Sequence, residues 1–120
     1  MTQRRAIALI DDDALVRSSM TSLLRSFGLS VRAFDSAIAF LELDPSQWDC
    51  LISDVHMPQM SGLDLARRLF ESHPSLPIIL ITAFPDAGVH EQAGGTRRVL
   101  EKPCAPEAIQ EALETFLGPL

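Results

Sequence analysis

The sequence predicts an α/β fold: a doubly wound parallel sheet of five strands flanked by helices. Short apolar runs alternate with longer segments of helical period along all 120 residues, a pattern typical of parallel strands joined by crossover helices. No linker or repeat interrupts this alternation, so residues 1–120 are expected to form one domain. A hydrophobic content of 47% is enough to fill the core of that domain.

Five apolar runs are predicted to be the strands. They span residues 6–10, 30–34, 50–53, 78–81 and 97–100. A strand buried on both faces is a continuous apolar run, whereas an edge strand alternates or carries charge. The first, third and fourth runs are therefore expected to be central, and the second and fifth to be edges. The order 2-1-3-4-5 satisfies this with right-handed crossovers and places the topological switch, where a ligand is expected, between strands one and three.

Apolar residues at helical spacing predict four amphipathic helices between the strands, with apolar stripes that face the sheet. The stripes are Val16, Met20, Leu23, Leu24 and Phe27; Ala37, Phe40 and Leu41; Ala66, Leu69 and Phe70; and Ile109, Ala112, Leu113 and Phe116. Asp35 or Ser36 suits the start of the second helix and Ser61 the start of the third. Pro106 suits a first helical turn, and Gly28 and Gly118 suit helix ends.

The segment 86–95 is expected to hold a further crossover helix, the fourth in chain order. Gly88, Gly94 and Gly95 weaken it, and few apolar residues are available to anchor it. This fourth helix is therefore expected to be short or mobile.

Charge and hydropathy argue against several classes of protein. The net charge of −6 would repel nucleic acid phosphates and anionic lipid, so no direct binding to nucleic acid or to a membrane is expected. No apolar stretch is long enough to span a bilayer, and the opening residues do not form a signal peptide. Cys50 and Cys104 form no C-x-x-C motif, so a reducing, cytoplasmic setting is expected.

Polar residues follow four of the predicted strands. Asp11, Asp12 and Asp13 follow the first, Asp54 the third, Thr82 the fourth, and Lys102 the fifth. In a parallel sheet all these positions lie on one edge, at the carboxyl ends of the strands, where α/β proteins build their sites. The sequence therefore predicts a site with several carboxylates, a hydroxyl and an ammonium group.

The energetics of this cluster indicate its chemistry. Two carboxylates about 5 Å apart repel by roughly 3 kcal/mol at an effective dielectric near 20, so a cation is needed. Lys102 supplies one charge, and oxygen ligands with open water positions suit Mg²⁺. Asp11 and Asp12 are expected to hold the metal, and Asp54 to attack phosphorus. Asp13 begins a predicted helix and is expected to cap it rather than bind the metal.

Four motifs stand in order along the chain: Ile10-Asp11-Asp12-Asp13, Ser53-Asp54-Val55-His56-Met57-Pro58-Gln59-Met60-Ser61-Gly62, Ile81-Thr82-Ala83 and Glu101-Lys102-Pro103. With these motifs the whole chain resembles the receiver domain of two-component response regulators, which has a CheY-like, flavodoxin-like fold. The Asp-Asp-Asp opening, Val16-Arg17 and Ala33-Phe34-Asp35-Ser36-Ala37 make it most similar to receivers of the FixJ/NarL group.

The resemblance implies a role for each residue of the site. Asp54 would accept a phosphoryl group from a sensor histidine kinase or phosphotransfer protein. Asp11, Asp12, Asp54 and the carbonyl of His56 would bind Mg²⁺, for which Mn²⁺ can substitute. Thr82 would be the switch hydroxyl, and Lys102, joined to Pro103 by a cis bond, the cation paired with the phosphate. Such a domain is not an enzyme and catalyses only its own phosphorylation and autodephosphorylation.

The resemblance also implies partners and an output face. A homodimer would form through the fourth helix, the fifth strand and the fifth helix, and a DNA-binding output domain would lie outside this chain. Two departures fall on that face: Val99 stands where the family often has Phe or Tyr, and the interval from Thr82 to Lys102 is shorter than usual. His56 and Phe84 are expected to flank the phosphate, and we hypothesise that they govern its lifetime.

Two other functions fit parts of the pattern. A phosphatase of the haloacid dehalogenase type also uses an Asp nucleophile and Mg²⁺, but Asp11-Asp12-Asp13-Ala14-Leu15 lacks the extension of its D-x-D motif. A phosphorylation-independent interaction module on the same fold is the alternative, favoured by Val99 and opposed by the costly acidic residues. Nucleotide binding is not supported, because neither G-x-x-x-x-G-K-[ST] nor G-x-G-x-x-G occurs.

Overall fold

A computed structural model describes residues 5–84 and 97–120 and contains one parallel sheet. Its strands are β1 (Ala6–Ile10), β2 (Ser30–Phe34), β3 (Cys50–Asp54), β4 (Ile78–Thr82) and β5 (Arg97–Glu101). Their order is β2-β1-β3-β4-β5, which confirms the predicted order and the two predicted edges. β3, β4 and β5 each run one residue further than predicted, so Asp54 and Thr82 belong to the strands themselves.

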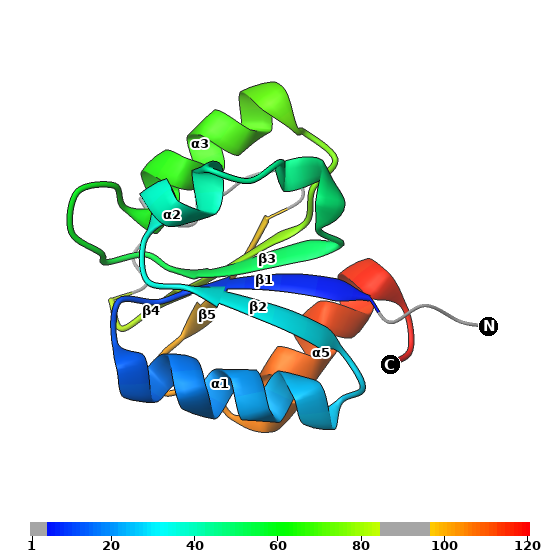
Figure 1. Ribbon diagram of the computed structural model, residues 1–120. Helices are drawn as coiled ribbons and strands as arrows, with labels where there is room; N and C mark the ends of the chain where they lie inside the picture. The colour runs from blue at the N-terminus through cyan, green and yellow to red at the C-terminus, as the bar shows by residue number, and fades with distance from the viewer. Residues whose placement is uncertain (1–4, 85–96) are drawn as a thin grey trace.

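Helices cover both faces of the sheet. They are α1 (Ala14–Ser26), α2 (Ala37–Leu41), α3 (Gly62–Ser72) and α5 (Pro106–Leu117), with a short 3₁₀ helix, η1, at Pro45–Gln47. Figure 1 shows α2 and α3 on one face of the sheet and α1 and α5 on the other, as a doubly wound fold requires. The predicted fourth helix, at 86–95, lies outside the described residues. No helix within 5–84 or 97–120 has the length and apolarity needed to cross a bilayer.

Two apolar layers fill the space between the sheet and the helices. Successive strand residues point to opposite faces, so Ile7 and Leu9 pack in the layer of α1 and α5, and Ala8 and Ile10 in the layer of α2 and α3. All five residues of β3 and of β4 are buried. This two-sided burial is the reason that the central strands have continuous apolar runs.

The helix boundaries follow the predicted capping chemistry. The Asp13 side chain accepts hydrogen bonds from the N–H groups of Leu15 and Val16, so it caps α1 as expected. Ser36 caps α2 and Ser61 caps α3 in the same way, which decides between Asp35 and Ser36. Each cap fixes the point at which the chain leaves the sheet edge that bears the site.

The prediction that Phe70 belongs to the core is wrong. Phe70, assigned to the apolar stripe of α3, is 58% exposed, whereas Leu65, Ala66 and Leu69 of that helix are buried. The Arg97 guanidinium lies over the Phe70 ring, 5.7 Å from its centroid, a distance at which a cation is attracted to an aromatic face. Phe70 therefore packs against a charged side chain instead of the sheet.

Candidate functional site

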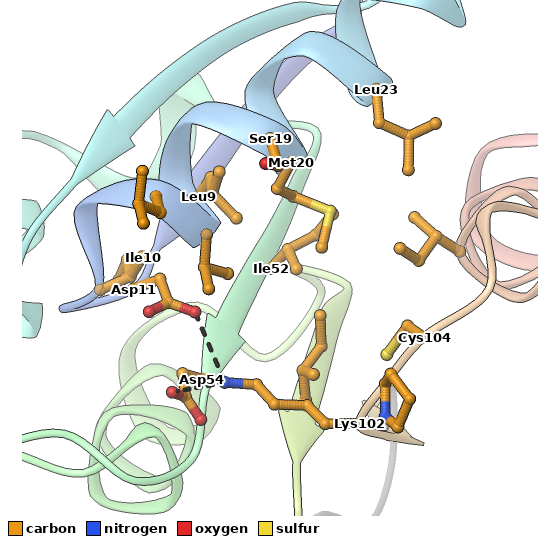
Figure 2. A pocket seen from close by; sticks show the side chains of 15 residues that line it. Leu9, Ile10, Asp11, Ser19, Met20, Leu23, Ile52, Asp54, Lys102 and Cys104 are labelled. Carbon is orange, nitrogen blue, oxygen red and sulfur yellow. Dashed lines mark hydrogen bonds and ion pairs between the residues drawn. The ribbon is translucent and has the colours of Figure 1, made fainter.

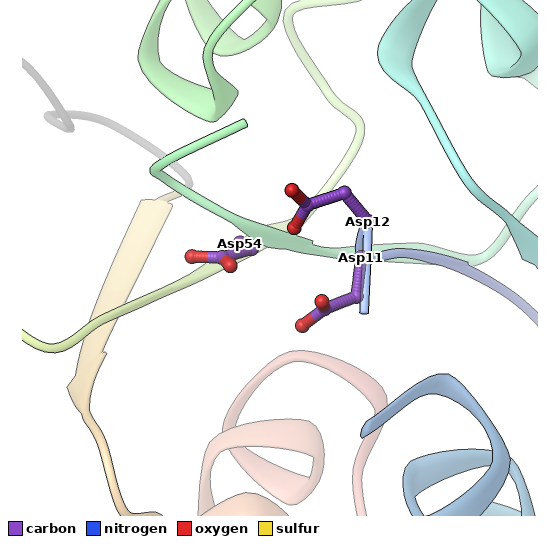
Figure 3. A group of neighbouring side chains, drawn as sticks. All are labelled: Asp11, Asp12 and Asp54. Atoms are coloured by element: carbon purple, nitrogen blue, oxygen red, sulfur yellow. The ribbon is translucent and has the colours of Figure 1, made fainter. Parts of the chain in front are cut away.

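Three carboxylates meet at the carboxyl ends of β1 and β3. Asp11 directly follows β1, and Asp54 is the last residue of the neighbouring strand β3. Asp11, Asp12 and Asp54, here called the acidic cluster, each offer an oxygen within 4.8 Å of the others. Figure 3 shows the three side chains gathered off the ends of these two strands. Asp11 and Asp54 are buried and Asp12 is exposed, so the cluster opens to solvent on one side.

Lys102 brings a positive charge to the two buried carboxylates. Its Nζ lies 3.0 Å from Asp54 Oδ2 and 3.7 Å from Asp11 Oδ2. The Lys102 backbone N–H donates to the Thr82 carbonyl at 2.8 Å, which ties the residue to the end of β4. The Lys102-Pro103 bond is cis, as the resemblance implied. The predicted meeting of Asp11, Asp12, Asp54 and Lys102 is therefore present in the fold.

Backbone N–H groups orient the buried carboxylates. Asp13 N–H donates to Asp11 Oδ1 at 2.9 Å, and His56 N–H donates to Asp54 Oδ1 at 3.2 Å. The Arg17 guanidinium donates to the Asp11 carbonyl at 2.8 Å and so ties the start of α1 to the end of β1. Two carboxylates held from the backbone in this way are preorganised for a cation or a substrate, and little reorientation is needed on binding.

Burial and neighbouring charges shift the pKa values of two residues in the site. Burial is the main reason that the pKa of Asp11 lies above its ordinary value, and the other carboxylates of the acidic cluster act in the same direction. Burial by itself would lower the pKa of Lys102, but the hydrogen bond and charge of Asp54, with the charges of Asp11 and Asp12, outweigh it and raise that pKa. Lys102 therefore stays an ammonium group at neutral pH.

The donor atoms of the acidic cluster fit a hard divalent cation. All are carboxylate oxygens, which Mg²⁺ prefers over nitrogen or sulfur ligands. Their mutual separations are short enough for one ion to contact all three residues, and the exposed side at Asp12 leaves room for water ligands. Lys102 alone leaves the cluster with an excess of negative charge, which a divalent ion would neutralise.

The remaining predicted site residues lie at the ends of β3 and β4, on the same edge of the sheet. Thr82 is fully buried at the end of β4, and its Oγ accepts a hydrogen bond from the Phe84 N–H at 3.0 Å. The His56 side chain is exposed, and its ring lies edge-on to the Phe84 ring, with the ring centroids 5.7 Å apart. The loops after β3 and β4 are thus joined by an aromatic pair in which Phe84 is 72% exposed.

Sequence reasoning missed the structural role of Gly62. The first residue of α3, Gly62, donates its N–H to the Val55 carbonyl at 2.9 Å. A Cβ at this position would overlap the backbone carbonyl of Asp54. Only glycine allows the helix to begin this close to the strand that bears Asp54. In the sequence, a glycine after a turn and before a helix is only a weak indication that two backbones lie this close. The structure is needed to show which backbone the glycine contacts.

A model of the response regulator receiver domain family matches residues 7–114. The chain belongs to this family. The response regulator protein TmoT of Ectopseudomonas mendocina is 40% identical over 118 residues, which are 96% of this chain and 54% of TmoT. The transcriptional regulatory protein FixJ of Bradyrhizobium diazoefficiens is 36% identical over 120 residues, 98% of this chain and 58% of FixJ. The receiver chain thus spans about half the length of these relatives.

Solved receiver structures have the same fold. The response regulator StyR is 34% identical with a TM-score of 0.83, over 96% of this chain and 60% of that one. The signal receiver domain of an HD domain-containing protein from Pseudomonas fluorescens Pf-5 is 29% identical with a TM-score of 0.85, over 96% of this chain and 95% of that one. The chain is therefore a receiver domain of two-component signalling.

Proposed function

We propose that Asp54 accepts a phosphoryl group from a sensor histidine kinase or a phosphotransfer protein. The observation that carries this proposal is the position of its carboxylate, buried at the end of β3, 3.0 Å from the Lys102 ammonium and within 4.8 Å of two further carboxylates. A carboxylate beside an ammonium and a cation site can act as a nucleophile, because the charge that develops on the phosphoryl oxygens is shared by those cations.

Each residue of the site has one task in the transfer. An Asp54 carboxylate oxygen forms the new bond to phosphorus, and the bond from phosphorus to the donor's imidazole nitrogen breaks. Lys102 donates hydrogen bonds to a phosphoryl oxygen. The Thr82 hydroxyl accepts a hydrogen bond from the Phe84 N–H and still has its own proton, which it donates to another phosphoryl oxygen.

The acidic cluster, with the backbone carbonyl of His56, would hold Mg²⁺ or Mn²⁺. The bound ion would supply a Lewis acid that shares the negative charge of the phosphoryl oxygens. The carboxylate donors of Asp11, Asp12 and Asp54 support this assignment. Among related receivers, DrrB has been solved with BeF₃ as its activator, at 26% identity and a TM-score of 0.83. Trigonal BeF₃ has the shape of a phosphoryl group, which supports a phosphoryl-shaped activator for this chain as well.

The chain would catalyse only its own phosphorylation and dephosphorylation. Since one Asp54 accepts one phosphoryl group, hydrolysis of the acyl phosphate resets the domain rather than turning over an external substrate. His56 and Phe84 belong to the loops that follow β3 and β4, and their rings are in contact. We propose that these rings limit the access of water to the phosphate.

Phosphorylation would be read out at the face of β5 and α5, together with the predicted fourth helix, by a change in dimerisation or in an output domain. Relatives such as FixJ, named as transcriptional regulators, are longer than the part that matches this chain, which supports a DNA-binding output unit as the partner. Val99 packs against the layer of α2 and α3 and has no aromatic ring. The proposed output therefore does not depend on the rotation of a ring at that position. We also propose that residues 1–120 form a single receiver unit and that this unit works in the cytoplasm.

The test is the intact mass of the protein after incubation with Mg²⁺ and a small phosphodonor such as acetyl phosphate. We expect one added phosphoryl group, which is lost when EDTA replaces Mg²⁺ and is absent in Asp54→Ala. Asp64→Ala is the matched control, because Asp64 is an exposed acid of α3 that pairs with Arg67 and does not belong to the acidic cluster. Failure of the wild-type protein to gain the group would contradict the proposal and favour a phosphorylation-independent interaction module.

A further inference from the structure

An apolar groove leads away from the acidic cluster, and its apolar walls take no part in the proposed transfer. It runs between α1 and the loop that joins β5 to α5, with a volume of about 590 Å³, within the range of small-molecule sites. Figure 2 shows Asp11, Asp54 and Lys102 at one end of this groove and Leu23 at the other. We call it the α1–α5 groove.

The walls of the α1–α5 groove are almost entirely apolar. Val16, Met20 and Leu23 of α1 form one wall, and Pro103 and Cys104 form the facing wall. Leu15, which is 80% exposed, stands at the rim. Residues of β1, β3 and β4 close the bottom and are almost fully buried, so an occupant would mainly contact the more accessible side chains of the two walls. Such walls fit an aliphatic chain.

The polar end of the groove carries an excess of negative charge. Three carboxylates of the acidic cluster against one ammonium, that of Lys102, leave a net charge of −2. Next to the cluster, the Arg17 guanidinium donates to the Asp11 carbonyl and the Asp13 carboxylate caps α1. These two side chains carry opposite charges, so together they leave the net charge unchanged. Asp11 and Asp54 both line the groove and are only 4% and 7% exposed, so their charges are poorly hydrated. A cationic head group is therefore complementary to this end and an anionic one is not.

We propose that the α1–α5 groove binds small amphipathic organic cations, namely aliphatic amines whose ammonium group meets the acidic cluster while the alkyl chain lies against Met20 and Leu23. An ammonium at this place competes with the divalent cation for Asp11 and Asp54. Bound amine thus holds the receiver in a metal-free state that cannot be phosphorylated. The competition rests on the metal site proposed above, whereas the binding of amine does not.

The first test is calorimetric titration of the metal-free protein with butylamine, hexylamine and octylamine. Affinity is expected to rise roughly tenfold for each two methylene groups added, because each one leaves water for an apolar wall. Octanoate and octanol are the controls for the head group. Equal binding of octanoate, or no increase of affinity with chain length, would overturn the proposal.

A matched pair of variants on α1 tests the location. Ser19 lines the groove and Ser18, its exposed neighbour, does not. Ser19→Phe fills the groove and is expected to weaken octylamine binding roughly tenfold, whereas Ser18→Phe leaves it unchanged. Thermal unfolding of both variants shows whether they are folded. Equal affinities of two folded variants would place the amine elsewhere and overturn the assignment.

The two cysteines give an independent readout. Cys104 lines the groove, whereas Cys50 is fully buried, and burial raises the pKa of the Cys50 thiol to about 12. Octylamine is expected to slow the alkylation of Cys104 by N-ethylmaleimide, and Cys50 stays unmodified throughout as an internal reference. Unchanged alkylation of Cys104 at saturating amine would contradict the proposal.

Competition with Mg²⁺ separates this inference from the proposed function. Added Mg²⁺ is expected to lower the apparent affinity for octylamine, and octylamine to slow phosphorylation by acetyl phosphate. If amine binds and no phosphorylation occurs under any condition, the proposed function fails and the groove assignment stands. If phosphorylation proceeds and amine neither binds nor slows it, only the groove assignment fails.

Discussion

At the scale of single residues, the site depends on a close approach of two backbones at Gly62. The amide of this residue bonds the Val55 carbonyl while its Cα leaves no room for a side chain above Asp54. The first turn of α3 therefore packs directly on the strand end that bears the proposed acceptor. A side chain at this position must push the helix and the Asp54 backbone apart.

Replacement of Gly62 by alanine tests this constraint. We expect Gly62→Ala to lower the free energy of unfolding by roughly 2–4 kcal/mol, because backbone rather than a flexible side chain must move. Gly28→Ala is the matched control: Gly28 has a φ of +85° and open space around its Cα, so that change costs only about 1 kcal/mol of backbone strain. Urea denaturation measures both values. Equal losses in the two variants would show that the contact with Asp54 is not limiting.

The positions of individual site residues could be predicted where those residues stand at the ends of strands. Asp11, Asp54 and Lys102 each stand at the end of an apolar run, and parallel pairing necessarily brings such ends to one edge. The need for glycine at position 62 was not predictable in this way, since it arises from the approach of a helix and a strand. The exposure of Phe70 was missed for a similar reason: the nearby guanidinium of Arg97 comes from a segment distant in the chain.

At the scale of elements, the loops after β3 and β4 meet through the rings of His56 and Phe84. Phe84 N–H bonds the Thr82 hydroxyl, and His56 N–H bonds Asp54, so each ring is fixed two residues from a proposed functional group. The strands were predictable because burial on two faces demands continuous apolar runs. The conformations of these loops were not, because neither loop has a repeating pattern.

The paired rings give a prediction for the lifetime of the acyl phosphate. In His56→Ala/Phe84→Ala, we expect dephosphorylation to be roughly threefold to tenfold faster, because water reaches the phosphate more easily. Loss of the phosphorylated species, followed by intact mass after removal of the phosphodonor, measures the rate. Ile38→Ala removes an exposed apolar side chain from α2 and serves as the control. A double variant with the wild-type rate would show that these rings do not control water access.

At the scale of the whole molecule, the fold holds an acidic cluster that by itself opposes folding. Burial raises the pKa of Asp11, so the folded state binds its proton more tightly than the unfolded chain does. This contribution favours folding at pH values below the ordinary Asp pKa and is lost as the pH rises through the higher pKa of the folded state. At neutral pH without metal, the charged Asp11 is thus a net cost, which the apolar layers on both faces of the sheet offset.

Asp11→Asn removes that charge and keeps the shape of the side chain. In EDTA at neutral pH, we expect this variant to unfold with a free energy about 1 kcal/mol higher than that of the wild type. The difference should vanish at pH values below the ordinary Asp pKa, where Asp11 is neutral in both states. Added Mg²⁺ should raise the unfolding temperature of the wild type alone. A variant less stable than the wild type in EDTA would refute the view that the charged Asp11 destabilises the metal-free fold.

Trapping of the acyl phosphate tests the central claim, that the acidic cluster and Lys102 make Asp54 the reactive carboxylate, most directly. Borohydride reduces an aspartyl phosphate to homoserine, and peptide mass spectrometry then locates the modified residue. After incubation with Mg²⁺ and acetyl phosphate, we predict homoserine at position 54 and at no other acidic position. Homoserine at Asp11, Asp12 or Asp13 instead, or at none of the aspartates, would contradict the account.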